Sequence, residues 1–297
     1  MLRTKAFLET HTRSLGGKTV AITGSTGGIG QELCTYLAEL GANLILLDRN
    51  ESRSYAHRDR LIRSYPRISV ECILTDLEEI DSVKHACESL RSRPVDILIH
   101  NAGAYSIPRR STSCGYDNVF QINFASPYYL IDTMLPTLRA KEGRVVVVGS
   151  IAHRYSKTDP TDVDFSTRTA SSKVYGNAKR YLMFGLWERF SREQGVKLTV
   201  AHPGITFTGI TAHYPKVIFA LIKHPMKVIF MRPARAALSI LWGVFEDTEA
   251  YQWIGPKWFD IWGLPRKKKL RSCSKEEIKG IAARSEQVLN TCKECAK

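Results

Sequence analysis

Short apolar runs alternate with longer helical segments along most of this chain, starting at residue 18. The short runs are rich in Val and Ile and carry few polar residues, as strands covered on both faces of a parallel sheet do. The expected strands are residues 18–23, 43–48, 69–75, 95–100, 143–150, 196–202 and, more weakly, 251–255. This alternation predicts an α/β fold with a doubly wound parallel sheet of about seven strands and helices on both faces.

The chain has 297 residues, which suits one large α/β domain or two small ones. No internal repeat or low-complexity linker divides it, so we expect a single domain over residues 18–264. Residues 1–17 are expected to form an N-terminal extension, and residues 265–297 a basic C-terminal tail. The opening segment lacks the apolar core of a signal peptide, and no apolar run is long enough to span a bilayer. Seven scattered cysteines favour a reducing cytoplasm.

The positive charge of the chain is concentrated in two segments. Lys and Arg number 43 against 29 Asp and Glu, which gives a net charge of +14. Residues 211–235 hold five bases and no acid, and residues 265–297 hold ten bases and four acids. These segments supply 11 of the 14 charges, so the rest of the chain is close to neutral. Binding of nucleic acid through a basic face of the core is therefore disfavoured.

A glycine-rich turn follows the first expected strand and opens a segment with helical period. Glycines allow the backbone to approach a phosphate, and the free N–H groups at a helix N-terminus face the anion. A tight turn without a ligand uses the same residues, but the position at the front of a βαβ unit favours a Rossmann-type dinucleotide site. The residues expected to bind the cofactor here are Thr23, Gly24, Ser25, Thr26, Gly28, Ile29 and Gly30.

Two residues at the end of the second expected strand bear on the choice of cofactor. Asp48 lies 18 residues after Gly30, where a carboxylate can accept hydrogen bonds from a ribose 2′-hydroxyl and would repel a 2′-phosphate. Arg49 follows directly, and an arginine there can pair with that phosphate. We expect NAD to be preferred, with NADP as the alternative.

A tyrosine and a lysine are spaced to work together on proton transfer. Interconverting an alcohol and a carbonyl needs a group that moves a proton to or from the substrate oxygen at neutral pH. Tyr175 and Lys179 lie four residues apart in a helical segment, so both fall on one helix face. A nearby ammonium lowers the pKa of a phenol by stabilising the phenolate. Ser150 ends the fifth expected strand, where its hydroxyl can hydrogen-bond the same substrate oxygen.

Three motifs resemble motifs of the short-chain dehydrogenase/reductase family: the glycine turn, an Asn-Ala-Gly turn and a Pro-Gly segment. The turn has the family's Thr-Gly-x-x-x-Gly-x-Gly spacing, which also fits the longer, extended relatives. Asn101-Ala102-Gly103 directly follows a strand, as in the shorter branch of the family. Pro203-Gly204, with Thr208 four residues later, is similar to the family's Pro-Gly segment after the sixth strand.

The residues for proton transfer extend this resemblance. Ser150, Tyr175 and Lys179 occur in the order of the family's triad, and Asn123 matches the asparagine that completes its tetrad. The separation of 25 positions between serine and tyrosine is wider than in most members. The Ala-His that follows the serine is similar to the retinol-dehydrogenase-like branch, and we expect His153 of that pair to be a candidate substrate contact.

The resemblance implies roles for these residues. Tyr175 is the expected general acid/base, Lys179 also binds the ribose, Ser150 orients the substrate oxygen, and Asn123 holds a water near the lysine. Residues 211–235 are the substrate lid, and family members commonly pair through the helices after the fourth and fifth strands, so a homo-oligomer is expected. The further residues expected to contact the cofactor are Asp76, Leu77, Asn101, Ala102, Gly103, Pro203, Gly204 and Thr208.

These expectations describe an NAD(P)-dependent oxidoreductase that interconverts an alcohol and a ketone or aldehyde, with a hydrophobic small-molecule substrate. One alternative is an extended-branch sugar-nucleotide epimerase or dehydratase, which the Asn-Ala-Gly motif and the chain length disfavour. The other is a catalytically idle NAD(P)-sensing protein, which has no need of a proton donor. The basic, apolar segment 214–233 allows peripheral contact with a membrane. Cys292 and Cys295 have metal-ligand spacing without a second pair, so no metal is expected.

Overall fold

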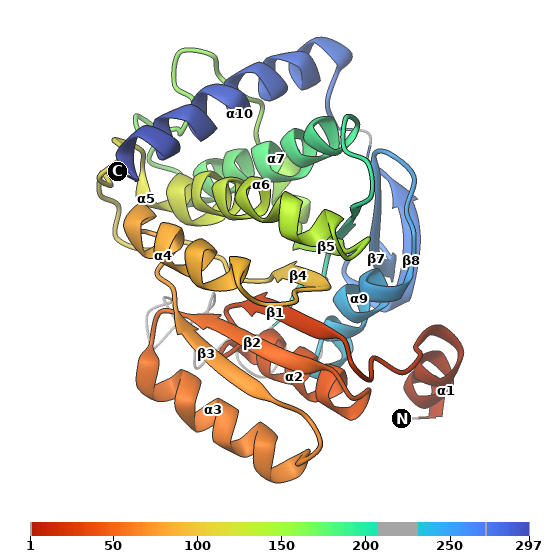
Figure 1. Cartoon of the computed structure of the whole chain (residues 1–297). Coiled ribbons are helices and arrows are strands. Elements are labelled where there is room, and N and C mark those ends of the chain that lie inside the picture. Colours follow the sequence, from red (N-terminus) through yellow and green to blue (C-terminus); the bar gives the residue numbers. More distant parts are fainter. Residues whose placement is uncertain (1, 207–230, 271, 297) are drawn as a thin grey trace, which may run out of the picture.

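A single eight-stranded sheet organises the molecule, as seen in a computed structural model that describes residues 2–206, 231–270 and 272–296 (Figure 1). The strand order is β3-β2-β1-β4-β5-β6-β7-β8, and every pairing is parallel except β7 with β8. The strands are β1 (Thr19–Thr23), β2 (Asn43–Asp48), β3 (Val70–Leu74), β4 (Ile97–His100), β5 (Arg144–Val148), β6 (Lys197–Ala201), β7 (Gln252–Trp258) and β8 (Trp262–Lys269). The predicted doubly wound Rossmann-type sheet is confirmed.

The eighth strand is the element that the sequence pattern did not indicate. β8 is antiparallel to β7, with Trp258 opposite Trp262 and Gln252 opposite Lys269. Its Pro and consecutive bases read as a solvated tail, but an edge strand tolerates such residues because its outer side pairs with nothing. The domain boundary expected after residue 264 therefore falls inside a strand.

Three long helices cover one face of the sheet, and a fourth, α10 (Lys275–Cys295), lies on their outer side (Figure 1). The three are α4 (Ile80–Arg91), α6 (Ser126–Arg139) and α7 (Ser171–Phe190). Their buried apolar residues form one cluster with the strands, including Leu98, Val147 and Trp253. Three short helices lead into this layer: α5 (Asn118–Phe120), η1 (Gln121–Ala125) and η2 (Ile151–Tyr155).

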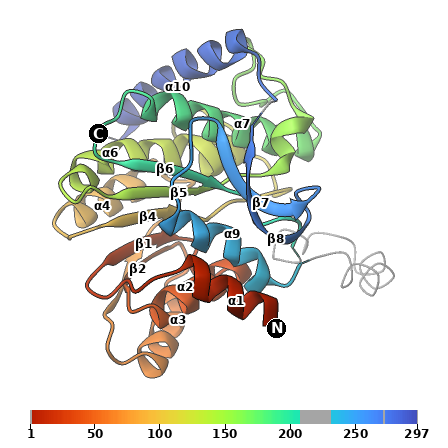
Figure 2. The same cartoon turned by 90° about the vertical axis from the view of Figure 1, so that its right-hand side faces the viewer.

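The opposite face is covered by α2 (Gly28–Glu39), α3 (Glu51–Ser64) and α9 (Pro233–Phe245). The N-terminal residues expected to be an extension pack here, since α1 (Leu2–His11) lies against α9 (Figure 2). Phe7 is buried, and its ring stacks on His11 and meets Trp242 edge-on at 5.8 Å between centroids.

The C-terminal residues expected to be a tail also belong to the core. α10 lies along α7 and buries Ile281, Val288 and Leu289 against it. At its start Glu277 pairs with the guanidinium of Arg180, a buried arginine of α7, at 2.7 Å. Among the described residues, no helix is long and apolar enough to cross a membrane.

Candidate active site

The candidate site residues gather at one edge of the sheet. Since β1 to β7 run parallel, their carboxyl ends meet at this edge, where open α/β sheets bind their ligands. Thr23 ends β1, His100 ends β4, Ser150 follows β5, and Pro203 follows β6. The sequence separates these residues by up to 180 positions, and the parallel register brings them to one place.

The glycine turn leaves a helix N-terminus open to a ligand. Gly27 and Gly28 at the start of α2 are exposed. The N–H of Gly27 donates to the carbonyl oxygen of Gly24 at 3.3 Å, whereas the first N–H groups of the helix itself have no partner within it. Gly24 has a φ of +69°, and a Cβ at this position would lie 2.9 Å from the Cα of Ala102. A Cβ on Gly30 would lie 2.2 Å from the carbonyl oxygen of Gly24. These glycines let the turn fold closely against itself and against Ala102, which a side chain would block. The exposed helix N-terminus beside them suits a dinucleotide phosphate.

Thr23 and His100 tie the glycine turn to the Asn-Ala-Gly turn. The Thr23 hydroxyl accepts hydrogen bonds from the backbone N–H groups of Asn101 and Ala102, each at 3.1 Å. Its own proton is then free for Nδ1 of His100, 3.1 Å away. This pattern assigns the proton of the imidazole to Nε2, which has no hydrogen-bond partner among the described residues. The sequence analysis did not single out His100, although it directly precedes Asn101.

Asn101 acts on the backbone of the glycine turn. Its Nδ2 donates to the carbonyl oxygens of Thr23 at 3.2 Å and Gly24 at 2.9 Å. Both bonds hold the two turns side by side, so Asn101 stabilises the backbone of the candidate cofactor site.

Asp48 is surrounded by donors from its own chain. Its side chain accepts from the hydroxyls of Ser25 at 2.5 Å and Ser54 at 3.0 Å, and from the backbone N–H of Thr26 at 3.3 Å. The Thr26 hydroxyl donates a fourth bond at 3.4 Å. Asp48 is only 3% exposed, so its carboxylate braces the glycine turn and has little capacity left for a ribose.

Two arginines lie at the solvent side of this brace. Arg49 is exposed directly after β2. Arg53, on α3, is exposed and donates from Nη2 to the carbonyl oxygen of Thr26 at 3.1 Å. The sequence reasoning identified Arg49 but not Arg53, whose approach to the turn depends on how α3 packs.

Tyr175 meets Ser150 at the start of α7. The serine hydroxyl is close enough to lower the pKa of the phenol, and the ring of Tyr105 packs edge-on against Tyr175 at 5.3 Å between centroids. Burial raises the pKa of Tyr175 to about 12, the Ser150 hydroxyl lowers it, and Tyr105 raises it further. The phenol is therefore protonated at neutral pH, which suits a group that donates a proton to a carbonyl oxygen.

Lys179 lies one helical turn further and is almost fully buried. Its Nζ donates to the carbonyl oxygen of Val148 at 3.0 Å and lies 5.7 Å from the centroid of the Tyr175 ring. Burial lowers the pKa of Lys179 to about 7. The lowered phenol pKa expected from the sequence is not found in this state of the protein, because the lysine is distant from the phenol and readily loses its charge.

Asn123 lies in a π-helical turn, η1, between α5 and α6. Its Nδ2 donates to the carbonyl oxygens of Ala104 and Val119, each at 2.8 Å. A Cβ on Gly103 would lie 2.9 Å from Oδ1 of Asn123 and 3.6 Å from Nζ of Lys179, so the three residues adjoin. Extra turns of this kind are frequent at functional sites because they redirect backbone groups.

The other expected cofactor residues differ in what they offer. Asp76 is half-buried after β3, where its Oδ1 accepts from the N–H of Glu78 at 3.0 Å, whereas the side chain of Leu77 lies in the apolar core. Pro203 and Gly204 are buried after β6. Thr208 and most of the expected lid, residues 211–235, lie outside the described residues.

Two histidines near the site are packed in its wall. His202 stacks on Trp253 at 5.1 Å between centroids, and His153 meets the same ring edge-on at 5.3 Å. Burial lowers the pKa of both imidazoles to about 4. His153 is only 1% exposed, so it does not face a substrate in this structure.

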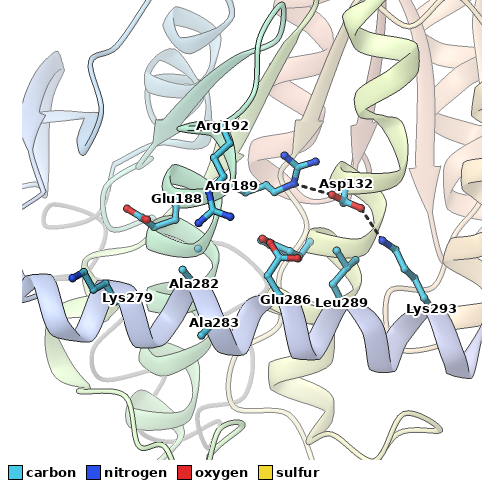
Figure 3. Close-up of a pocket in the computed structure, with 12 residues that line it drawn as sticks. Asp132, Glu188, Arg189, Arg192, Lys279, Ala282, Ala283, Glu286, Leu289 and Lys293 are labelled. Atoms are coloured by element: carbon cyan, nitrogen blue, oxygen red, sulfur yellow. Dashed lines mark hydrogen bonds and ion pairs between the residues drawn. The ribbon is translucent and has the colours of Figure 1, made fainter.

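A groove of about 600 Å³ lies away from these residues, between α6, α7 and α10 (Figure 3). Its charged lining is already paired in part, since Asp132 accepts from Arg189 at 2.9 Å and from Lys293 at 3.2 Å. α10 covers the outer face of α6 and α7 here. No cluster of three or more metal-ligating side chains occurs within residues 2–206, 231–270 and 272–296.

A family comparison agrees with this arrangement. The model of the short chain dehydrogenase family matches residues 18–216, about two thirds of the chain. The chain belongs to the short-chain dehydrogenase/reductase family. It is therefore an NAD(P)-dependent oxidoreductase, and neither the epimerase nor the sensing alternative is favoured.

Several known proteins are similar to this family member. The chloroplastic short-chain dehydrogenase TIC 32 A of Brassica napus is 30% identical over 222 residues, which cover 69% of each chain. The human WW domain-containing oxidoreductase is 31% identical over 207 residues, 65% of this chain and 50% of that protein.

Solved structures show the same fold. An uncharacterized protein from Mycobacterium paratuberculosis superposes with a TM-score of 0.74 at 24% identity and covers 95% of this chain and 96% of its own. The NADP complex of Pseudomonas aeruginosa RhlG superposes with a TM-score of 0.59 at 24% identity, covering 80% of this chain and 93% of its own. The first likeness spans nearly the whole chain, including the region of β8 and α10.

Proposed function

We propose that this protein interconverts an alcohol and a ketone or aldehyde, with Tyr175 as general acid/base. The position of Ser150 beside Tyr175 at the carboxyl edge of the sheet, with Lys179 one helical turn further, carries this proposal. Ser150 orients the substrate oxygen toward the phenol, and Lys179 and Asn123 line the same site through their contacts with Gly103. When bound, the nicotinamide supplies or takes the hydride.

Tyr175 can give its proton in the reductive direction without further activation. Its phenol is protonated at neutral pH, and the neighbouring serine hydroxyl can accept a hydrogen bond from it or donate one to the substrate. In the oxidative direction the phenolate is needed, and a charged Lys179 close to it would stabilise that form. Hydrogen bonds from the ammonium to a bound ribose would favour the charged lysine, so cofactor binding and phenolate formation are coupled in this proposal.

NADP(H) is the cofactor that the environment of Asp48 supports better. The hydrogen-bonding capacity of this carboxylate is already used by four donors from Ser25, Ser54 and Thr26. Arg49 and Arg53 are exposed at the same end of the turn, where a guanidinium can pair with a 2′-phosphate. The sequence-based expectation of NAD assumed that the Asp48 carboxylate is free to accept hydrogen bonds from a ribose.

A hydrophobic substrate is supported by the ring of Tyr105 beside Tyr175 and by the apolar content of residues 214–233. The Ala152-His153 pair after Ser150 is the feature that relates this site to retinol-dehydrogenase-like proteins. A steroid, retinoid or long-chain carbonyl is the substrate class we propose.

The surroundings of the enzyme are also a proposal. We infer a reducing cytoplasmic location with peripheral membrane contact, and all seven cysteines are free thiols in agreement with it. A homo-oligomer that pairs through α6 and α7 must include α10 in its interface, because this helix covers them.

Replacement of Tyr175 by Phe tests the catalytic assignment. Turnover of NADPH with a panel of steroid, retinoid and long-chain carbonyl compounds should fall by roughly 10²- to 10⁴-fold, the usual contribution of general acid/base groups. Cofactor binding, followed by fluorescence titration, should stay within about two-fold because the glycine turn is unchanged. Tyr155→Phe removes a hydroxyl from an exposed tyrosine nearby and should leave turnover unaltered. A Tyr175→Phe enzyme with more than about a tenth of the original activity would refute the assignment.

A further inference from the structure

Three large aromatic side chains are exposed together at the tip of the β7–β8 hairpin. Phe259 is 78% exposed, Trp258 is 56% exposed and Trp262 is 39% exposed. Single exposed apolar residues are ordinary on protein surfaces, but contiguous ones mark interaction sites. Trp258 and Trp262 are directly opposite each other in the β-ladder, so the exposed rings share one small surface. We call Trp258, Phe259 and Trp262 the aromatic tip.

Contacts of the buried Asp260 hold the aromatic tip in a fixed conformation. Phe259 and Asp260 have φ angles of +53° and +59°, a region that non-glycine residues seldom adopt. The Asp260 carboxylate is buried and pairs with Lys268 at 2.6 Å and Arg154 at 3.0 Å. His202 Nε2 lies 3.0 Å from the backbone carbonyl of Asp260. These contacts stabilise a turn in which Phe259 points outward, although the positive φ angles cost backbone energy.

Basic residues lie beside the aromatic tip and along its hairpin. Residues 251–270 contain five Lys or Arg and a single acid, Asp260, whose charge is already matched by Lys268 and Arg154. Lys257 is exposed next to the tip and lies over the ring of Trp258, with Nζ 4.9 Å from its centroid. Arg266 is exposed further along the hairpin, opposite Gly255. The surface is thus apolar at the tip and cationic on one side of it.

The aromatic tip also adjoins the candidate active site. β7 is parallel to β6, so the tip lies at the same edge of the sheet as Ser150 and Tyr175. A Cβ on Gly204, in the Pro-Gly segment, would lie 2.8 Å from the carbonyl oxygen of Ile261 in the hairpin. The hairpin forms the end of the sheet beyond β6 (Figure 2).

We propose that the aromatic tip and the bases beside it dock this protein on the surface of an anionic lipid bilayer. Tryptophan rings favour the membrane–water interface, where one part is apolar and the indole N–H remains hydrated. Lysine and arginine near the tip attract anionic headgroups. Protection of an edge strand accounts for the bases of β8 but not for three exposed aromatic rings. Docking places the carboxyl edge of the sheet at the bilayer, which would deliver a hydrophobic substrate if the proposed function is correct.

Vesicle binding by the whole chain tests this proposal without any substrate. Vesicles of phosphatidylcholine with about 30% phosphatidylserine should sediment the protein, and vesicles of phosphatidylcholine alone should do so at least about ten-fold less well. Phosphatidylserine vesicles that carry brominated acyl chains should quench part of the tryptophan fluorescence. Trp187 and Trp253 are buried and Trp242 is half-buried, so the quenched signal should come from Trp258 and Trp262.

Two variants and a matched control make the test specific. Phe259→Asn removes the most exposed ring and places a residue that tolerates a positive φ in the turn, so the fold should be retained. Trp258→Gln removes a second ring. Each should weaken vesicle binding about ten-fold, as expected for the loss of one buried aromatic side chain. Leu74→Ser, at an exposed position of β3 on the opposite edge of the sheet, should leave vesicle binding unchanged.

The outcomes separate lipid from other partners. Folded variants that bind vesicles as tightly as the natural chain overturn the proposal, as does equal binding to neutral and anionic vesicles. Self-association that the two variants abolish, without any vesicle binding by the natural chain, assigns the aromatic tip to a second copy and also overturns it. Failure of the carbonyl panel leaves these binding results unchanged, so the proposal and the proposed function fail independently.

Discussion

The two ends of the candidate site differ in how their buried polar groups are satisfied. At the nucleotide end, Asp48 receives four hydrogen bonds from Ser25, Ser54 and Thr26. At the catalytic end, Lys179 is buried with one carbonyl acceptor, and Nε2 of His100 has no partner among the described residues. The nucleotide end is assembled by the chain alone, whereas the catalytic end leaves polar groups for a ligand or water to satisfy.

This difference separates stability from function. A fully bonded buried carboxylate makes the turn rigid before any cofactor arrives, which lowers the entropy cost of binding. A buried lysine without a carboxylate partner costs free energy in the empty protein, and sites commonly retain such costs because the group is needed later. Four measurements can break or sharpen the comparison.

Low pH should destabilise the folded protein through neutral, buried histidines at both the nucleotide end and the catalytic end of the site. Burial lowers the pKa of His57, next to Ser25, and of His153 and His202 from 6.5 to about 4. Between these values the unfolded chain binds more protons, so the unfolding free energy should fall as pH drops from 6.5 toward 4, by about 1 to 3 kcal/mol for each histidine. Urea unfolding at pH 7, 6 and 5 measures this. A constant free energy over that range would contradict the burial of neutral imidazoles.

Lys179→Met should stabilise the cofactor-free protein while abolishing turnover. The lysine's pKa is lowered from 10.5 to about 7, so the cost of its charge is fully present below pH 7 and disappears as pH rises to about 10.5. The gain in unfolding free energy at pH 6 should be roughly 2 to 4 kcal/mol. Lys173→Met, at an exposed lysine of the same helix, should change it by less than about 0.5 kcal/mol. A destabilised Lys179→Met protein would show that the buried ammonium is satisfied after all.

Asp48→Ala should have the opposite effect on stability. Removal of the carboxylate leaves the donors of Ser25, Ser54 and Thr26 unpaired in a buried position, so the unfolding free energy should fall by about 2 to 4 kcal/mol. Asp59→Ala, at a half-exposed position of α3, is the matched control and should stay within about 0.5 kcal/mol. Chemical denaturation of both variants at pH 7 makes the comparison. An unaltered Asp48→Ala protein would mean that the nucleotide end does not depend on this brace.

Arg49→Ala should give the smallest effect and concerns the ligand alone. Loss of the guanidinium should weaken NADPH binding by about ten-fold and leave NADH binding within two-fold, since a charged hydrogen bond to phosphate is worth about 1.5 to 3 kcal/mol. Arg60→Ala, at an exposed arginine of α3, should alter neither NADPH nor NADH binding. Tighter binding of NADH than of NADPH by the natural chain would restore Asp48 as the residue that selects the cofactor.

Local patterns were sufficient for most of the scaffold and indicated which candidate residues follow the ends of the strands. All seven expected strands occur where the apolar runs indicated, and the glycine turn begins α2 as its spacing predicted. Tyr175 and Lys179 share a helix face because helical periodicity is a property of the local chain. Their catalytic roles stay a prediction until Tyr175→Phe is measured.

What the sequence determined by itself was thus the order of elements and the residue types at the carboxyl edge, because hydrophobic period and turn chemistry act over a few residues. Only the tertiary structure decided that residues 265–297 join the core, since β8 needs β7 as a partner and α10 needs the face of α7. It also decided that Asp48 is braced and that Lys179 is buried without a carboxylate. Those properties depend on which donors and charges the packing brings near, and residues far apart in the chain supply them.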